Sequence, residues 1–248
     1  MNGLLKSVVS GLVLSLSVTG AIAADLPEPP VIEYEPAPEF VEIGSSWYIR
    51  ADIGYKIYAE PSLGRTGEEW INSAADHTGL VGAGVGYRWN DSLRTDLTLD
   101  YEFPTNIDGN APCGGCGAGL YSAESADLSV WTVLFNGYFD IGTWSGFTPY
   151  VGAGVGASYV KVDNVAFVNP NGATGTYEGD DKWNFSWALM AGTSYEVSEN
   201  LAIDAGYRYL HIGEGKTKPV NGNGITAPIQ YKDLAAHEFR MGVRYSLN

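Results

Sequence analysis

The chain ends in the stretch 237-HEFRMGVRYSLN-248. From Phe239 onward, its odd positions are apolar and its even positions are charged, polar or glycine. This period of two predicts a β-strand with two different faces, because successive side chains of a strand point to opposite sides. Glu238, Arg240 and Arg244 all lie on one face, which cannot enter an apolar core without partners for its charges. The fold must therefore supply a polar compartment and a second strand for the open edge.

Seven earlier stretches show the same alternation. They are the predicted strands 47–58, 78–89, 93–103, 128–141, 147–162, 182–197 and 201–212. Three short turns near residues 90, 144 and 199 alternate with four long links, 59–77, 104–127, 163–181 and 213–234. Short turns at one end, long loops at the other and an even strand number are typical of outer-membrane barrels. We predict an all-β fold, an eight-stranded antiparallel up-and-down transmembrane β-barrel over residues 47–248.

A barrel in aqueous solution, such as a lipocalin, is the rival interpretation, and it would turn its apolar face inward. The polar face carries seven bases and eight acids, although the whole chain has a net charge of −15. Such a balance indicates pairing in a confined lumen and favours the membrane barrel. The predicted lumen charge network comprises Arg50, Asp52, Lys56, Arg88, Arg94, Asp96, Asp100, Glu102, Asp140, Glu196, Asp204, Arg208, Glu238, Arg240 and Arg244.

Aromatic residues on the apolar face gather near both ends of the predicted strands. Two such rings are what the interfaces of a bilayer select. The predicted aromatic girdle includes Trp47, Trp89, Trp131, Trp187, Phe239 and Tyr245.

The N-terminal region differs in composition from the predicted strands. Residues 1–23 combine one lysine, an apolar run and small residues at Ala21 and Ala23, which predicts a cleaved signal peptide. A membrane anchor is the alternative, but serines and a threonine interrupt the apolar run. Residues 24–46 carry five prolines and six acids without a base, which predicts an extended periplasmic arm. The acidic balance of the chain argues against nucleic acid as a partner.

The sequence resembles the porin-like, opacity-type outer-membrane β-barrel family. The resemblance rests on AADLP after the predicted signal peptide, WYIRADIGY from Trp47, PYVGAGVG from Pro149 and HEFRMGVRY from His237. It implies a barrel in the cell outer membrane that contributes to envelope integrity, surface antigenicity or adhesion. Implied partners are outer-membrane lipids, lipopolysaccharide, the assembly machinery through the closing strand, and a surface ligand at the loops. The family usually ends in an aromatic residue, whereas this chain ends in Leu247-Asn248, and the two expectations are that Tyr245 serves instead or that assembly is less efficient.

Other candidate sites have both a specific and a simple interpretation. Cys113-Gly-Gly-Cys116 predicts a surface disulfide after export, with redox or zinc use as the alternative. His211 and His237 lie at outward positions near the loop ends, where simple interfacial histidines are expected, and contact with lipopolysaccharide phosphates or half of a lipid-modifying site is the alternative. We expect no metal, no cofactor and no enzyme activity. A structural and surface-interaction barrel is the leading hypothesis, followed by a small porin and then by a lipid-modifying enzyme.

Overall fold

The computed structural model describes residues 46–65, 67–113, 115–222 and 225–247. The predicted signal peptide, and all of the predicted arm except Ser46, lie outside the described residues. No described residue belongs to a helix long and apolar enough to cross a membrane. The strands are β1 (Trp47–Tyr58), β2 (Ser62–Arg65), β3 (Glu68–Glu69), β4 (Ile71–Ala75), β5 (Thr78–Arg88), β6 (Leu93–Pro112), β7 (Tyr121–Asp140), β8 (Phe147–Val162), β9 (Val165–Val168), β10 (Thr174–Tyr177), β11 (Asp181–Glu196), β12 (Leu201–Lys216), β13 (Val220–Gly222), β14 (Ile225–Ala227) and β15 (Gln230–Ser246).

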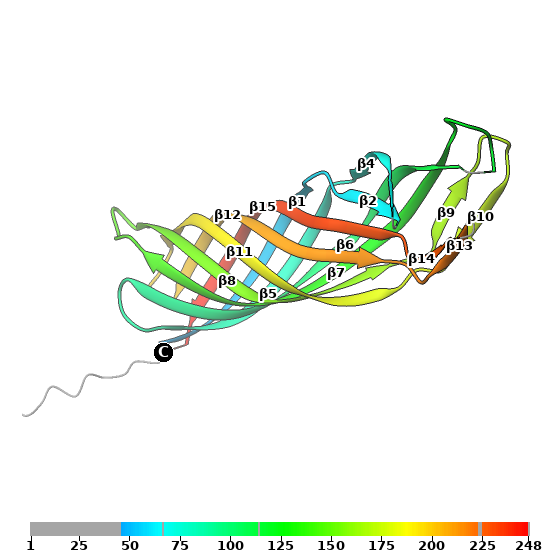
Figure 1. Ribbon diagram of the computed structural model, residues 1–248. Coiled ribbons are helices and arrows are strands. Elements are labelled where there is room, and N and C mark those ends of the chain that lie inside the picture. The colour runs from blue at the N-terminus through cyan, green and yellow to red at the C-terminus, as the bar shows by residue number, and fades with distance from the viewer. Residues whose placement is uncertain (1–45, 66, 114, 223–224, 248) are drawn as a thin grey trace, which may run out of the picture. The chain divides into compact units, whose positions relative to one another are not determined.

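Eight long strands close into a ring in which every neighbouring pair is antiparallel (Figure 1). Their order is β1, β5, β6, β7, β8, β11, β12 and β15. The last strand pairs with the first from Tyr48↔Ser246 to Tyr58↔Ala236, so the edge that the sequence leaves open is closed. The predicted fold class, an eight-stranded antiparallel barrel, is confirmed.

The two faces of each strand lie in opposite environments. In β1, Ile49 and Ile53 are 48% and 65% exposed, whereas Asp52 and Lys56 on the other face are 5% and 2% exposed. Apolar side chains therefore cover the outside and charged ones fill the inside. A barrel in water would have the reverse arrangement, so this pattern is that of a membrane barrel.

The three short turns lie at one end of the ring, which we call the short-turn end. In the first turn, the Asn90 side chain accepts hydrogen bonds from the backbone N–H groups of Ser92 and Leu93, at 2.9 and 2.8 Å. This local bond explains why an asparagine begins so tight a connection. The opposite, long-loop end carries the cap, which we define as the described residues within 59–77, 104–127, 163–180 and 213–234.

The cap contains more regular structure than the sequence predicts. Residues 104–127 are not simply a loop, because β6 continues to Pro112 and β7 begins at Tyr121. The outer halves of these strands join β4, β9 and β10 in one antiparallel sheet, while β2 pairs with β15 and β3. Apolar residues such as Trp70 and Tyr231 fill the cap, and the same core extends down to Leu134 and Leu210 inside the barrel.

Candidate functional site

Nine charged side chains inside the barrel form one ladder of alternating sign, the charge ladder. Arg208 lies near its middle, 2.8 Å from Asp100 and 2.6 Å from Glu238. Lys56 continues the ladder from Glu238 toward the long-loop end at 3.3 Å. The order of its members is Glu102, Lys56, Glu238, Arg208, Asp100, Arg240, Asp52, Arg50 and Asp96.

Two further ion pairs lie near the short-turn end. Arg94 contacts Asp140 at 3.0 Å, and Arg244 contacts Asp204 at 3.5 Å. The Arg94 guanidinium also lies over the rings of Tyr138 and Tyr150, 4.4 and 4.7 Å from their centroids. Cation–π contact adds to the stabilisation of a desolvated charge. These tyrosines were not among the predicted site residues, although both occupy inward positions of predicted strands.

Two members of the predicted network have a different placement. Glu196 is exposed, and neither it nor the half-buried Arg88 belongs to an ion pair among the described residues. Both residues end their strands at the short-turn end. Water reaches an inward position at the rim of a barrel, so a charge there needs no partner. Glu196 therefore lies at the open rim of the barrel and outside the paired network of the described residues.

Inward glycines make room for the large interior side chains. A Cβ added at Gly82 would lie 2.0 Å from the Asp100 carboxylate, and one at Gly86 would lie 2.2 Å from the Tyr48 ring. On the opposite wall, a Cβ at Gly154 would lie 2.1 Å from the Asn136 side chain. Glycine inside a strand permits such close approach. The glycine rows are therefore packing positions for the polar interior.

A small cavity lies inside the barrel, beside the charge ladder. It lies between Arg50, Tyr138, Tyr150, Met190 and Arg240 and offers about 20 Å³ to water. This is room for about one water molecule. Beyond the charge ladder, toward the long-loop end, the interior is apolar, and its fully buried members include Leu128, Val130, Val160 and Leu210. Paired charges and an apolar layer thus fill successive sections of the barrel.

The predicted girdle residues all lie on the outward face. Trp47 and Trp89 contact Tyr87 from either side, with ring centroids 5.3 and 4.8 Å away. Exposures among the girdle range from 44% at Trp131 to 62% at Trp89, except that Trp187 is half-buried. Trp187 stacks on His211, a contact that the sequence pattern did not predict.

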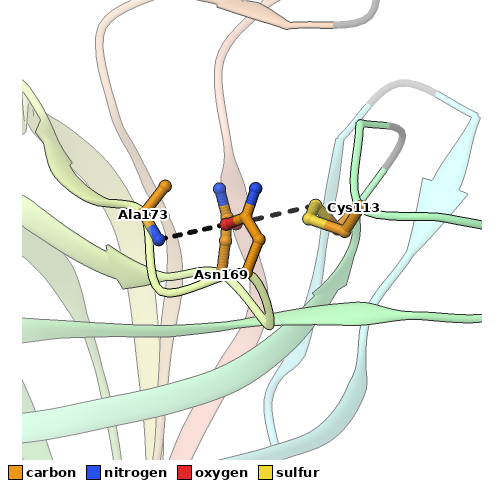
Figure 2. Close-up of a disulfide and its surroundings, with 5 residues drawn as sticks. Cys113, Asn169 and Ala173 are labelled. Atoms are coloured by element: carbon orange, nitrogen blue, oxygen red, sulfur yellow. Dashed lines mark hydrogen bonds between the residues drawn. A yellow bond between two sulfur atoms is a disulfide. The ribbon is translucent and has the colours of Figure 1, made fainter.

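The two cysteines lie at the tip of the cap, in the connection between β6 and β7. Cys113 and Cys116 form a disulfide. The Oδ1 atom of Asn169, in the turn between β9 and β10, lies 3.6 Å from Cys113 Sγ (Figure 2). The Asn169 backbone N–H donates to the Ala173 carbonyl at 2.8 Å. The two turns therefore meet at the tip. Among the described residues, no group of three or more His, Cys, Asp or Glu is placed to hold a metal ion.

Comparisons with known proteins agree with this architecture. The model of a family described as outer membrane protein beta-barrel domain matches residues 36–246. An uncharacterized protein of Brucella abortus (strain 2308) is 36% identical over 279 residues, covering 94% of each chain. A Rickettsia bellii protein named "Putative adhesin" is 30% identical over 218 residues, covering 84% of this chain and 91% of the relative.

One solved structure gives the same picture of the fold. The outer membrane protein OprG from Pseudomonas aeruginosa matches with a TM-score of 0.52 at 18% identity. The match covers 81% of this chain and 96% of that chain. At this level of identity, the likeness concerns the barrel fold alone.

Proposed function

The chain belongs to the outer membrane protein beta-barrel domain family, and from this premise we propose that it is a surface-interaction protein whose barrel anchors the cap outside the cell. The protein is a barrel of the outer membrane. In such barrels the long-loop end faces outward, which places the cap on the cell surface. The observation that carries the proposal is the folded cap above a filled barrel.

A rigid cap is suited to contact with other surfaces. The sheet of β4, β6, β7, β9 and β10 grows directly from barrel strands, so the membrane part fixes its position. At the tip, the apolar side chains Leu120, Tyr121 and Val168 are 44%, 39% and 54% exposed. Exposed apolar groups on a rigid element are typical of binding surfaces. The name of the Rickettsia bellii relative points in the same direction.

The filled interior supports an anchoring role for the barrel. The charge ladder and the apolar layer leave space for about one water molecule near the ladder. Eight-stranded barrels generally have interiors just wide enough for side chains. The cap is therefore the part of the molecule that is available to partners other than lipid.

Adhesion of intact cells tests the proposal. A non-adherent Gram-negative host is made to express the full chain, and its attachment to epithelial cells is counted. We expect attachment to rise with the wild type and to fall to the background level when Leu120, Tyr121 and Val168 are all replaced by Asp. Lys218→Ala, an exposed cap substitution, should leave attachment unchanged. Equal attachment by the triple variant and the wild type, at equal surface amounts, would refute the role of the tip.

A further inference from the structure

All three histidines of the sequence lie near the long-loop end, on one side of the barrel. His211 on β12 and His237 on β15 are diagonal neighbours, because His237 pairs with Tyr209. Diagonal positions of this kind lie about 7–8 Å apart, which lets two side chains reach one small group. His77 lies next to Tyr55, with ring centroids 6.0 Å apart.

Aromatic neighbours hold the two imidazoles in place. The Tyr207 hydroxyl lies 2.7 Å from His237 Nδ1, and the His211 ring stacks on Trp187 at 5.6 Å with an interplanar angle of 10°. With the phenol donating, the His237 proton resides on Nε2, which is then a donor for another partner. His211 Nδ1 is buried and has no hydrogen-bond partner within the described part of the chain, so Nε2 is the His211 nitrogen that can meet an outside group.

An apolar groove runs below this pair on the same strands. Its lining belongs to β1, β12 and β15 and comprises Ala51, Asp52, Ile53, Ile203, Met241, Gly242 and Val243. The small residues Ala51 and Gly242 contribute to the hollow, and Ala51 pairs with Val243. From His237 to Val243 the strand advances six residues, roughly 20 Å at about 3.3 Å each. With a strand tilt of about 40°, this corresponds to roughly 15 Å of depth, the thickness of one leaflet.

We propose that this face binds one phosphorylated lipid of the outer leaflet. The phosphate lies between His211 and His237, and one acyl chain occupies the groove. The amphipathic character of the face matches such a lipid, because nitrogen donors lie at headgroup level and an apolar hollow lies below them, with its far end about one leaflet deep. On the opposite side of the ring, β6 and β7 carry Tyr101 and Trp131, whose ring centroids lie 4.5 Å apart at an interplanar angle of 40°. The inference is independent of adhesion by the cap.

Native mass spectrometry of the detergent-purified full chain tests this site. The probe is diphosphoryl lipid A, compared with its dephosphorylated form and with inorganic phosphate alone. We expect one tightly retained diphosphoryl lipid, little retention of the dephosphorylated form, and no adduct with inorganic phosphate. A phosphate hydrogen bond is a charge-assisted contact, so removing both imidazoles should weaken retention by about ten-fold or more.

The variants distinguish this site from lipid that coats the whole barrel. His211→Phe with His237→Phe should reduce retention, and Tyr207→Phe should reduce it less. Tyr101→Phe, which removes a hydroxyl at the same level on β6, should have no effect. Heat-dependent gel mobility verifies that each variant is folded. Equal retention by the double variant and the wild type would overturn the proposal, as would equal retention of the dephosphorylated lipid.

Discussion

Glu238 is fully buried and has three basic neighbours, Lys56, Arg208 and Arg240. A buried carboxylate depends on its partners, because its desolvation is not repaid by water. We expect Arg208→Met to destabilise the barrel by about 3–5 kcal/mol, since it leaves Glu238 and Asp100 short of a counter-charge. The measurement is urea-induced unfolding of vesicle-embedded protein, followed by tryptophan fluorescence.

The matched control for this prediction is an exposed ion pair. Lys161 contacts Asp163 at 2.8 Å, with both side chains about half exposed. Exposed pairs contribute between zero and about 1 kcal/mol, so Lys161→Met should have little effect. A similar loss in the free energy of unfolding for both variants would contradict the prediction, because it would mean that the buried ion pairs of Arg208 stabilise the barrel no more than an exposed pair does.

Tyr48 occupies the space left by Gly86, which makes this glycine a test of interior packing. A Cβ at position 86 would lie 2.2 Å from the Tyr48 ring, so Gly86→Ala should cost about 1–3 kcal/mol. In a Tyr48→Ala background the same change should cost almost nothing, because the obstacle is gone. A Cβ added at Gly137, which faces outward, would meet nothing within 4 Å, so Gly137→Ala should be nearly neutral. Urea unfolding of the wild type, the two single variants and the double variant measures the coupling, and additive effects would contradict it.

At the scale of strands, the sequence predicted the eight barrel elements because alternation persists wherever one face meets lipid. Strands β1 and β8 have the predicted bounds, 47–58 and 147–162. The prediction stopped at Phe103 and began the next long link at Pro104. In the structure the register shifts between Glu102 and Thr105, and β6 continues. Such a bulge exchanges the two faces, so the inward positions change from even to odd numbers and the sequence pattern is interrupted.

The candidate site could be predicted only in part, for a related reason. Alternation indicates which charges face inward, as for Asp52 and Arg240, but not which of them touch. Contacts depend on register across the ring and on the reach of each side chain. Glu124 shows a second limit, because it lies at an inward position of β7 that the prediction treated as a loop.

Glu124 makes the stability of the cap depend on pH. It is 4% exposed, and its Oε2 atom has no hydrogen-bond partner within the described residues. Burial raises the pKa of the Glu124 carboxyl to about 7, and the nearby Arg65 partly opposes this shift. Burial also raises the pKa values of Tyr177 and Tyr231, which interact with Glu124, so both phenols stay neutral.

A pKa that is raised by folding means that ionisation opposes folding. The contribution of Glu124 to cap stability is therefore fully present below pH 4.5 and is lost as the pH rises to about 7. At pH 8, Glu124→Gln should stabilise the cap by on the order of 3 kcal/mol, and the difference should shrink toward zero near pH 4. Amide hydrogen exchange in β9, compared between the two proteins at each pH, measures this. The exposed change Glu178→Gln is the control, and a pH-independent difference would contradict the prediction.

At the scale of the molecule, closure joins the two ends of the described chain. β1 pairs with β15, so the ring cannot form until the last strand is available. Closure also assembles the interior, because Arg240 on β15 reaches Asp100 on β6 and Asp52 on β1. The polar face of the C-terminal stretch thus lies in a neutralising compartment, while its apolar face meets lipid. Pairings of such long sequence separation favour slow folding.

The filled interior predicts that the purified protein conducts no ions at the level of a porin. Two barriers act in series, the charge ladder with its tyrosines and the apolar layer that includes Val130 and Leu210. Single-channel recording in planar bilayers should show no stable steps, with a general porin as the positive control. Replacing Tyr138 and Tyr150 by Ala enlarges only the polar section, so this variant should also stay silent. Steps of porin size from the wild type would establish a small pore, and steps from the variant alone would place the whole barrier in the polar section.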